Sequence, residues 1–250
     1  MISVKNISKS FNNVKILDDI SFDFHKGKTN LIIGKSGSGK SVLTKCMVGL
    51  LEPDNGDVYY QETKLSSLKI KEKKQIRKQL GMLFQGSALF DSLSVADNVA
   101  FPLKMITSLS SNDISERVNF CLNRVDIINK NELFPSELSG GMQKRVAIAR
   151  AISMQPQYLF CDEPNSGLDP VTAIVIDELI KEITEEYNIT TVVITHDMNS
   201  VLEIGDNILF IDSGKNKWQG SKDEILDSDV KELNDFIYVS KFLKQLKKNR

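Results

Sequence analysis

Alternating and continuous apolar segments divide the chain into two kinds of predicted strand. Residues 2–7 and 20–24 alternate between apolar and polar positions, which predicts half-buried antiparallel strands. Mostly apolar runs instead predict strands that are buried on both faces of a parallel sheet. These runs lie at residues 29–33, 80–84, 158–161, 190–194 and 207–211.

Segments with apolar residues every three or four positions separate these strands and predict helices. They cover residues 42–50, 138–153, 170–187 and 199–204, and further helices are predicted at the charged segment 69–79 and at residues 222–226. The stretch from residue 91 to about 135 is also predicted to be helical, with Asn112 and Asp113 as its candidate N-cap. Because strands alternate with helices, the fold class is α/β, with a doubly wound parallel core sheet. The predicted fold also contains an antiparallel β subdomain and an inserted α-helical subdomain at about residues 91–150.

Composition narrows the class of protein. With 250 residues, the chain is long enough for one large α/β domain. A net charge of −1 argues against a protein that wraps nucleic acid, and the six Lys/Arg within residues 69–79 are typical of a solvated helix face. Three scattered cysteines predict neither a zinc site nor disulfides. Because the sequence shows neither a signal peptide nor about 18 consecutive apolar residues, we expect a soluble chain.

A phosphate-binding loop follows the run at residues 29–33. The spacing G-x-x-x-x-G-K-S starts at Gly34, and the flanking strand and helix favour this interpretation over an ordinary Gly/Ser-rich turn. Lys40 would reach the outer phosphates of a nucleotide triphosphate, and the Ser41 hydroxyl would hold Mg²⁺. The candidate nucleotide-binding residues here are Gly34, Ser36, Gly37, Ser38, Gly39, Lys40, Ser41 and Val42.

Polar residues also follow three other predicted strands, namely Gln85, the pair Asp162 and Glu163, and His196. Ligands of open α/β sheets bind at the carboxyl ends of the strands, so these residues are expected to converge on one phosphate tail. Asp162 stands where phosphate-loop ATPases hold magnesium through a carboxylate. Glu163 would position or deprotonate the attacking water. Two acids at a strand end alone would be a weak signal.

A second anion-binding helix end is predicted at Ser139, Gly140 and Gly141, which open a helix. One nucleotide does not easily occupy two such ends of one domain. The natural arrangement is a head-to-tail pair, in which the second site of each chain closes over the nucleotide of its partner. From the residues alone, Phe11 is either a core residue or an aromatic ring that stacks on a base.

These motifs, in this order and spacing, resemble those of the ATP-binding cassette (ABC) family over roughly residues 1–225. The resemblance implies an ABC-type P-loop NTPase that binds ATP and Mg²⁺ and hydrolyses ATP to ADP and phosphate. It implies that Glu163 is the general base, that His196 contacts the γ-phosphate, and that Gln85 touches the magnesium and senses a partner's coupling helix. Magnesium would be held by Ser41, Gln85 and Asp162.

The same resemblance implies a homodimer. Ser139, Gly140 and Gly141 would bind the γ-phosphate of the opposing chain, and Asp169 would link the two sites across the dimer. Phe11 stands where the family stacks an aromatic ring on adenine. The chain departs from the family at Met142, where glutamine is usual. Since a thioether donates no hydrogen bond, a ribose contact from this position is in doubt.

The resemblance leaves three kinds of ABC protein: transporter motors, translation-associated ATPases with two cassettes, and DNA-repair members with long coiled coils. One cassette with a compact insert favours the motor of a bacterial transporter, peripheral on the cytoplasmic face of the inner membrane, with an integral membrane permease as partner. Residues 84–95 and 97–99, with the signature ending in Met142, resemble Mla-type ATPases, which work with MCE-type lipid-binding proteins. Lipid transport is therefore expected; amino-acid importers and lipoprotein-releasing exporters are the alternatives.

The C-terminal end is predicted to be a helical extension, residues 229–250, of an ATPase domain that spans residues 1–228. A helix over residues 230–248 carries an apolar stripe of Phe236, Val239, Phe242, Leu243 and Leu246. This stripe either packs on its own cassette or docks on the second ATPase or an accessory subunit.

Overall fold

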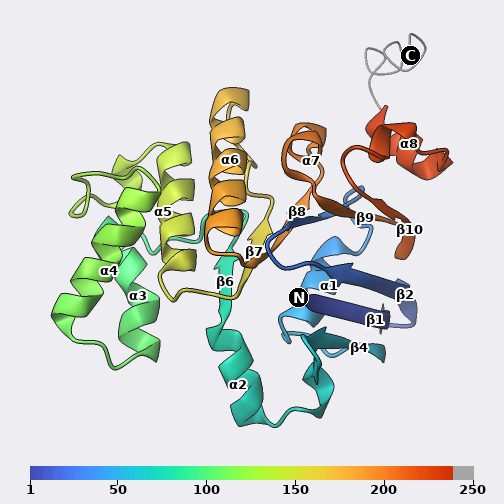
Figure 1. Ribbon diagram of the computed structural model, residues 1–250, viewed down its shortest axis with the longest axis horizontal. Helices are drawn as coiled ribbons and strands as arrows, with labels where there is room; N and C mark the ends of the chain where they lie inside the picture. Colours follow the sequence, from blue (N-terminus) through green and yellow to red (C-terminus); the bar gives the residue numbers. More distant parts are fainter. Residues whose placement is uncertain (239–250) are drawn as a thin grey trace. The chain divides into compact units, whose positions relative to one another are not determined.

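The chain forms two compact units in a computed structural model that describes residues 1–238. Of the described residues, unit 1 consists of residues 1–25, 29–68 and 194–238. Unit 2 consists of residues 26–28 and 69–193. Figure 1 shows the elements of both units, coloured along the sequence.

An antiparallel sheet occupies the N-terminal part of unit 1, in the strand order β2-β1-β4-β5. Its strands are β1 (Ile2–Phe11), β2 (Val14–Phe24), β4 (Asn55–Tyr60) and β5 (Thr63–Lys64). β1 and β2 pair antiparallel, as their alternating pattern predicts. The turn between them has φ values of 48° at Asn12 and 64° at Asn13, and asparagine tolerates this left-handed conformation better than most residues.

A second group of strands in unit 1 follows the order β10-β9-β3. The group consists of β3 (Thr29–Ile33), β9 (Asn207–Asp212) and β10 (Lys215–Gly220). β3 and β9 are parallel and β10 is antiparallel to β9. All five residues of β3 are buried, as expected of a central strand. The helices of this unit are α1 (Lys40–Met47), α7 (Met198–Ile204) and α8 (Lys231–Ile237).

Unit 2 contains strands in the order β8-β7-β6 and most of the helices. The strands are β6 (Leu80–Leu83), β7 (Tyr158–Asp162) and β8 (Thr190–Thr195), of which residues 190–193 belong to this unit. β6 and β7 are parallel. The helices are α2 (Ile70–Lys78), α3 (Val95–Ile106), α4 (Ser111–Arg124), α5 (Gly140–Ile152) and α6 (Pro170–Glu186).

Helices α3, α4 and α5 pack against one another (Figure 1). Their buried side chains include Val99 and Leu103 of α3, Cys121 of α4, and Val146 and Ile148 of α5. The helices expected after residue 91 are therefore present. The mixed α/β architecture with a parallel core confirms the predicted fold class.

Two local predictions are wrong. The N-cap of α4 is Ser110, not Asn112 or Asp113: the Ser110 hydroxyl accepts a hydrogen bond from the Asp113 N–H, and the Asp113 carboxylate accepts one from the Ser110 N–H. This reciprocal capping box satisfies two backbone donors at once. The helix expected at residues 222–226 is a single 3₁₀ turn at Ile225–Asp227.

The C-terminal stripe is only partly visible. α8 covers Lys231–Ile237, and the ring centroid of Phe236 lies 5.5 Å from that of Phe210 in β9. Phe236 thus packs on its own unit, while Val239, Phe242, Leu243 and Leu246 lie outside the described residues. Within residues 1–238, no helix is long and apolar enough to cross a membrane.

Candidate functional site

The phosphate loop lies between β3 and α1 in unit 1 and is folded around the Lys40 ammonium. Lys40 is 8% exposed, and its Nζ donates hydrogen bonds to the carbonyls of Gly34 and Lys35, at 2.7 and 3.0 Å. The N-cap of α1 is Gly39, and no side chain of the described residues caps this helix end. Its first N–H groups and the positive end of its dipole are therefore available to an anion. Ser41 is exposed beside them.

Close backbone contacts explain the glycines at both ends of the loop. A side chain at Gly34 would meet the Ile211 carbonyl oxygen of β9 at 2.1 Å. Gly39 has a φ of 110°, and a Cβ there would lie 2.7 Å from Leu17 Cδ2 of β2. L-amino acids rarely adopt this φ, so glycine is favoured for conformation as well as space. β2 and β9 therefore hold the loop in place.

Phe11 lies at the tip of the β1–β2 hairpin in the same unit. It pairs in register with Val14 of β2, the strand that continues to Leu17 beside the phosphate loop. Its ring is 42% exposed, and Lys9 Nζ lies 5.6 Å from the ring centroid. The core interpretation of Phe11 is therefore wrong, and the exposed ring is available for stacking.

Asp162 and Glu163 lie at the carboxyl end of β7 in unit 2, and both are half-buried. Glu163 has a φ of 47°, in the left-handed region that non-glycine residues rarely occupy. Strained backbone of this kind persists where the surrounding structure demands it, and it concentrates at functional sites. The left-handed conformation of Glu163 turns the chain after the strand. The turn is closed by a hydrogen bond of 3.1 Å from the Ser166 N–H to the Glu163 carbonyl.

The signature segment forms the start of α5, as predicted. Ser139 is the N-cap, and its hydroxyl accepts a hydrogen bond from the Met142 N–H at 3.3 Å. Ser139 and Gly140 are exposed. A Cβ on Gly141 would lie 2.6 Å from Thr172 Cγ2, so glycine allows α5 to approach the first turn of α6.

Asp169 is the N-cap of α6, a structural role that was not predicted from the sequence. Its carboxylate accepts hydrogen bonds from the Val171 and Thr172 N–H groups at 3.1 and 3.0 Å. The Thr172 hydroxyl also donates to it, at 2.5 Å. These bonds lower the pKa of Asp169 and keep it ionised at the exposed helix end.

Two cationic side chains of α5 hold the segment that begins at Gln85, and sequence reasoning missed both. Lys144 Nζ donates a hydrogen bond to the Gln85 carbonyl. Arg150 donates to the carbonyls of Ser87 and Ala88, each at 2.7 Å. Ser87 and Ala88 have φ values of 61° and 48°, so the guanidinium stabilises two consecutive left-handed residues. The sequence signal for these two contacts was the presence of Lys144 and Arg150 within a largely apolar helix.

Lys144 is 4% exposed, so burying its charged ammonium costs the free energy of removing that group from water. Burial lowers the pKa of its ammonium, whereas Cys161, Asp162 and Glu163 act in the opposite direction. Gln85 itself is exposed, and its Nε2 lies 3.5 Å from Ser166 Oγ. The Gln85 segment, the acids after β7 and helix α5 are thus connected within one unit.

His196 follows β8 and is exposed, in unit 1 with the phosphate loop and Phe11. Next to it, Asp197 caps α7 by accepting a hydrogen bond from the Asn199 N–H at 2.9 Å. Each unit therefore brings together one part of the predicted site. Unit 2 holds Gln85, the signature glycines, the acids after β7 and Asp169.

Comparison with known proteins gives the family. The family described as "ABC transporter" matches residues 17–166. Methionine import ATP-binding protein MetN of Clostridium tetani is 42% identical over 86% of this chain and 67% of its own length. Intermembrane phospholipid transport system ATP-binding protein MlaF of Haemophilus influenzae is 39% identical over 91% of this chain and 86% of its own length. The chain belongs to the ABC transporter family and contains its ATP-binding domain.

Solved structures agree with this assignment. The ATP-binding cassette MJ0796, in a dimeric post-hydrolysis state bound to ADP and Pi, matches with a TM-score of 0.79. It is 31% identical, over 89% of this chain and 99% of its own. CbiO1 of Clostridium perfringens matches with a TM-score of 0.85 and 27% identity over 98% of both chains. The protein is an ATP-binding ATPase that hydrolyses ATP to ADP and phosphate.

Proposed function

We propose that the chain is the motor subunit of a bacterial lipid transporter, working as a homodimer at the cytoplasmic face of the inner membrane. The observation that carries the dimer is the division of anion-binding helix ends between the units. α1 presents an end without a side-chain cap in unit 1, and α5 presents exposed Ser139 and Gly140 in unit 2. Head-to-tail pairing of two copies would place the second end over the nucleotide bound by the first.

Magnesium fits the residues present. Mg²⁺ on a nucleotide takes oxygen ligands and is commonly held by one or two carboxylates together with phosphates and water. The described residues contain no group of three or more His, Cys, Asp or Glu that could hold a metal by themselves. The exposed Ser41 hydroxyl, the Asp162 carboxylate and the Gln85 amide would each supply one oxygen. The ion would offset phosphate charge, while Glu163 acts as the base on the attacking water.

In the proposed chemistry, Lys40 would leave the carbonyls of Gly34 and Lys35 and donate to the outer phosphates. The N–H groups at the start of α1 would bind the same phosphates, and Phe11 would stack on adenine. His196 and, from the opposing chain, Ser139, Gly140 and Gly141 would bind the γ-phosphate, while Asp169 links the two sites. Hydrolysis would then wait for the second copy.

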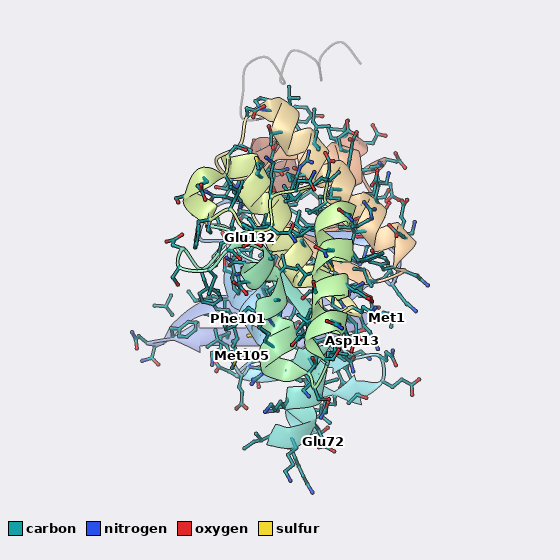
Figure 2. The ribbon with its side chains drawn as sticks, turned by 90° about the vertical axis from the view of Figure 1, so that its left-hand side faces the viewer. Met1, Glu72, Phe101, Met105, Asp113 and Glu132 are labelled. Atoms are coloured by element: carbon teal, nitrogen blue, oxygen red, sulfur yellow. The ribbon has the colours of Figure 1, made fainter. Side chains whose placement is uncertain are left out.

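An exposed apolar surface next to the Gln85 segment supports a permease as partner. It consists of Phe90, Phe101, Met105 and Ile106, which are 42%, 37%, 69% and 41% exposed. Phe90 and Phe101 have ring centroids 4.6 Å apart. The buried Asn98 fixes Phe90, accepting a hydrogen bond from its N–H at 2.8 Å. Figure 2 labels Phe101 and Met105 on α3. Adjacent exposed apolar groups on one helix are typical of a protein-binding surface.

Lipid transport is supported by the resemblance of residues 84–95 and the Met142 signature to Mla-type ATPases, and by the likeness to MlaF. An MCE-type lipid-binding protein and an accessory subunit would complete such a transporter. Methionine or other amino-acid import is the second candidate, because the likeness to MetN is equally strong. The signature variant Met142 favours the lipid proposal.

The cargo is tested by purifying the complex from membranes with a tag on this chain. We expect a permease and an MCE-type protein to copurify, and bound phospholipid to be found by mass spectrometry. Recovery of an amino-acid permease with a solute-binding protein would contradict the lipid proposal and favour the alternative.

The hydrolytic mechanism is tested with Glu163→Gln. Loss of the general base is expected to lower the ATPase kcat by about 10²–10⁴-fold while ATP binding persists. The ATP-bound variant should accumulate as a dimer in size-exclusion chromatography, and the wild-type chain should not. Glu178→Gln, elsewhere in unit 2, is the matched control. An unimpaired kcat in Glu163→Gln would disprove the base assignment.

A further inference from the structure

Helix α2 is the most cationic segment of unit 2 that the proposed site does not use. Residues 69–79 carry six Lys/Arg and one Glu, a net charge of +5 in a chain whose total is −1. No residue of the helix is buried. Figure 2 labels Glu72 on this helix. A helix without a buried face contributes little to a hydrophobic core, so its composition is free to serve another purpose.

The arrangement of charges on α2 is one-sided. Ile70, Lys74 and Arg77 follow the spacing of one helical row, with Lys71 beside them, and all four are exposed. The Glu72 carboxylate instead accepts a hydrogen bond from the Lys69 N–H at 2.7 Å, at the N-terminal end of the helix. Its charge therefore serves the helix end and does not lie in the cationic row.

An apolar side chain stands within this cationic row. Ile70 is 87% exposed, the highest value among the exposed large apolar side chains of the described residues. Water is an unfavourable environment for an isoleucine side chain, so a surface that buries Ile70 would gain from the contact. Lys and Arg around an exposed aliphatic residue are typical of helices that lie on anionic bilayers, where the cations meet headgroups and the apolar group enters the interface.

We propose that α2 binds the surface of a bilayer that contains anionic phospholipids. Charge complementarity selects this occupant: a row of cations with an aliphatic group at its centre matches a headgroup layer. The inference takes from the proposed function only that the bilayer surface is the cytoplasmic face of the membrane. In that setting α2 would anchor unit 2 against the bilayer next to the permease.

The test uses the full chain and vesicles, without a permease. Cosedimentation is measured with phosphatidylcholine vesicles and with vesicles that are about one-third phosphatidylglycerol, a mixture with a negative surface potential. We expect binding only to the anionic vesicles, and its loss in high salt, which screens exposed charges. Equal binding to both compositions, or none to either, would overturn the proposal.

A triple variant localises the contact. Lys71→Gln, Lys74→Gln and Arg77→Gln together remove three cations, each worth about 1 kcal/mol near an anionic surface, so the partition coefficient should fall roughly 100-fold. Ile70→Ser should lower it by a smaller factor. Both variants should keep wild-type ATPase activity, which shows that they fold.

The matched control carries Lys244→Gln, Lys247→Gln and Lys248→Gln, an equal loss of charge at the other basic stretch of the sequence. It should bind vesicles like the wild type. An α2 variant that binds like the wild type, or a control that loses as much, would overturn the assignment. So would an α2 variant that binds vesicles normally but fails to copurify with the permease, since α2 would then bind an acidic protein. Failure of the vesicle test leaves the Glu163 and copurification tests unaffected.

Discussion

Two glycine-containing helix ends, those of α1 and α5, satisfy their backbone donors in different ways. At α1 the N-cap is Gly39, which has no side chain to accept from the first turn. At α5 the N-cap is Ser139, whose hydroxyl accepts from Met142. The first end therefore has no side-chain acceptor of its own, whereas at the second end the Ser139 hydroxyl satisfies one of the backbone donors in the isolated chain. We therefore expect helix α1 to be the primary anion site, and α5 to contribute only when a second copy approaches.

Each unit also contains a buried lysine with a comparable task. Among the described residues, Lys40 and Lys144 are the buried lysines, and both donate to main-chain carbonyls. Lys40 holds the loop in which it lies, so it can exchange its carbonyl partners for phosphate oxygens. Lys144 holds a segment far away in sequence, so its bond fixes the position of Gln85. The same side-chain chemistry is thus expected to serve ligand binding in unit 1, while it positions a main-chain segment in unit 2.

The largest effect is expected from Lys40→Ala. Charge-assisted hydrogen bonds contribute about 1.5–3 kcal/mol each, so loss of the ammonium should raise the Kd for ATP by at least about 100-fold. Isothermal titration with ATP measures it. Lys45→Ala removes an exposed lysine of the same helix and is the matched control. Wild-type affinity in Lys40→Ala would contradict the assignment of α1 as the primary anion site.

Alanine at a glycine of each helix end is the next test. Gly39→Ala combines a left-handed φ with the contact to Leu17, so it should lower the free energy of unfolding by about 1–3 kcal/mol. Gly140 has only an ordinary 3.6 Å neighbour, Leu168, and an alanine there should be tolerated. Urea denaturation of the nucleotide-free chain measures both. Equal destabilisation by the two variants would remove the distinction between the helix ends.

Ser139→Ala should have a smaller effect on the isolated chain. Loss of an N-cap costs about 1 kcal/mol, and Ser139→Asn, which can cap the helix, is the matched control. Both are measured by urea denaturation without nucleotide. If Ser139→Ala were as stable as the wild type, the capping bond at 3.3 Å would contribute nothing, and the α5 end would be as open as that of α1.

The smallest effect concerns Cys46, on the buried side of α1. Burial raises the pKa of its thiol from 9.0 to about 11. The thiol should therefore resist alkylation by iodoacetamide at pH 8 in the folded chain and react after unfolding. Because the unfolded chain loses this proton first, stability should fall as the pH rises from 9 towards 11. Rapid alkylation of the folded chain at Cys46 would show that α1 is not firmly packed.

Sequence patterns predicted most of the elements because their causes are local. The alternation in β1 and β2, the apolar run of β3 and the spacing of the phosphate loop depend on neighbours along the chain. The N-cap at Ser110 was missed because three polar residues in succession, Ser110, Ser111 and Asn112, all suit that position. Only the reciprocal bond with Asp113 distinguishes them.

The contacts that hold the site together were not predictable in the same way. Arg150 meets Ser87 and Ala88 across more than sixty residues, and Lys144 meets Gln85 across 59. Nothing near Glu163 in the sequence indicates its left-handed backbone, because glutamate rarely adopts it. Family resemblance supplied the roles of these segments, but only tertiary structure shows which side chains support them.

Helix α5 connects the Gln85 segment to the signature segment that begins at Ser139. Ser139 lies at its N-terminus. Farther along the helix, Lys144 and Arg150 donate hydrogen bonds to main-chain carbonyls of the Gln85 segment. At 1.5 Å per residue, Ser139 and Arg150 are about 16 Å apart along the axis, so a tilt of about 10° displaces one end by roughly 3 Å relative to the other. That stroke exceeds the tolerance of a hydrogen bond. A displacement of the Gln85 segment that tilts α5 would therefore also displace Ser139, without a change in any intervening contact.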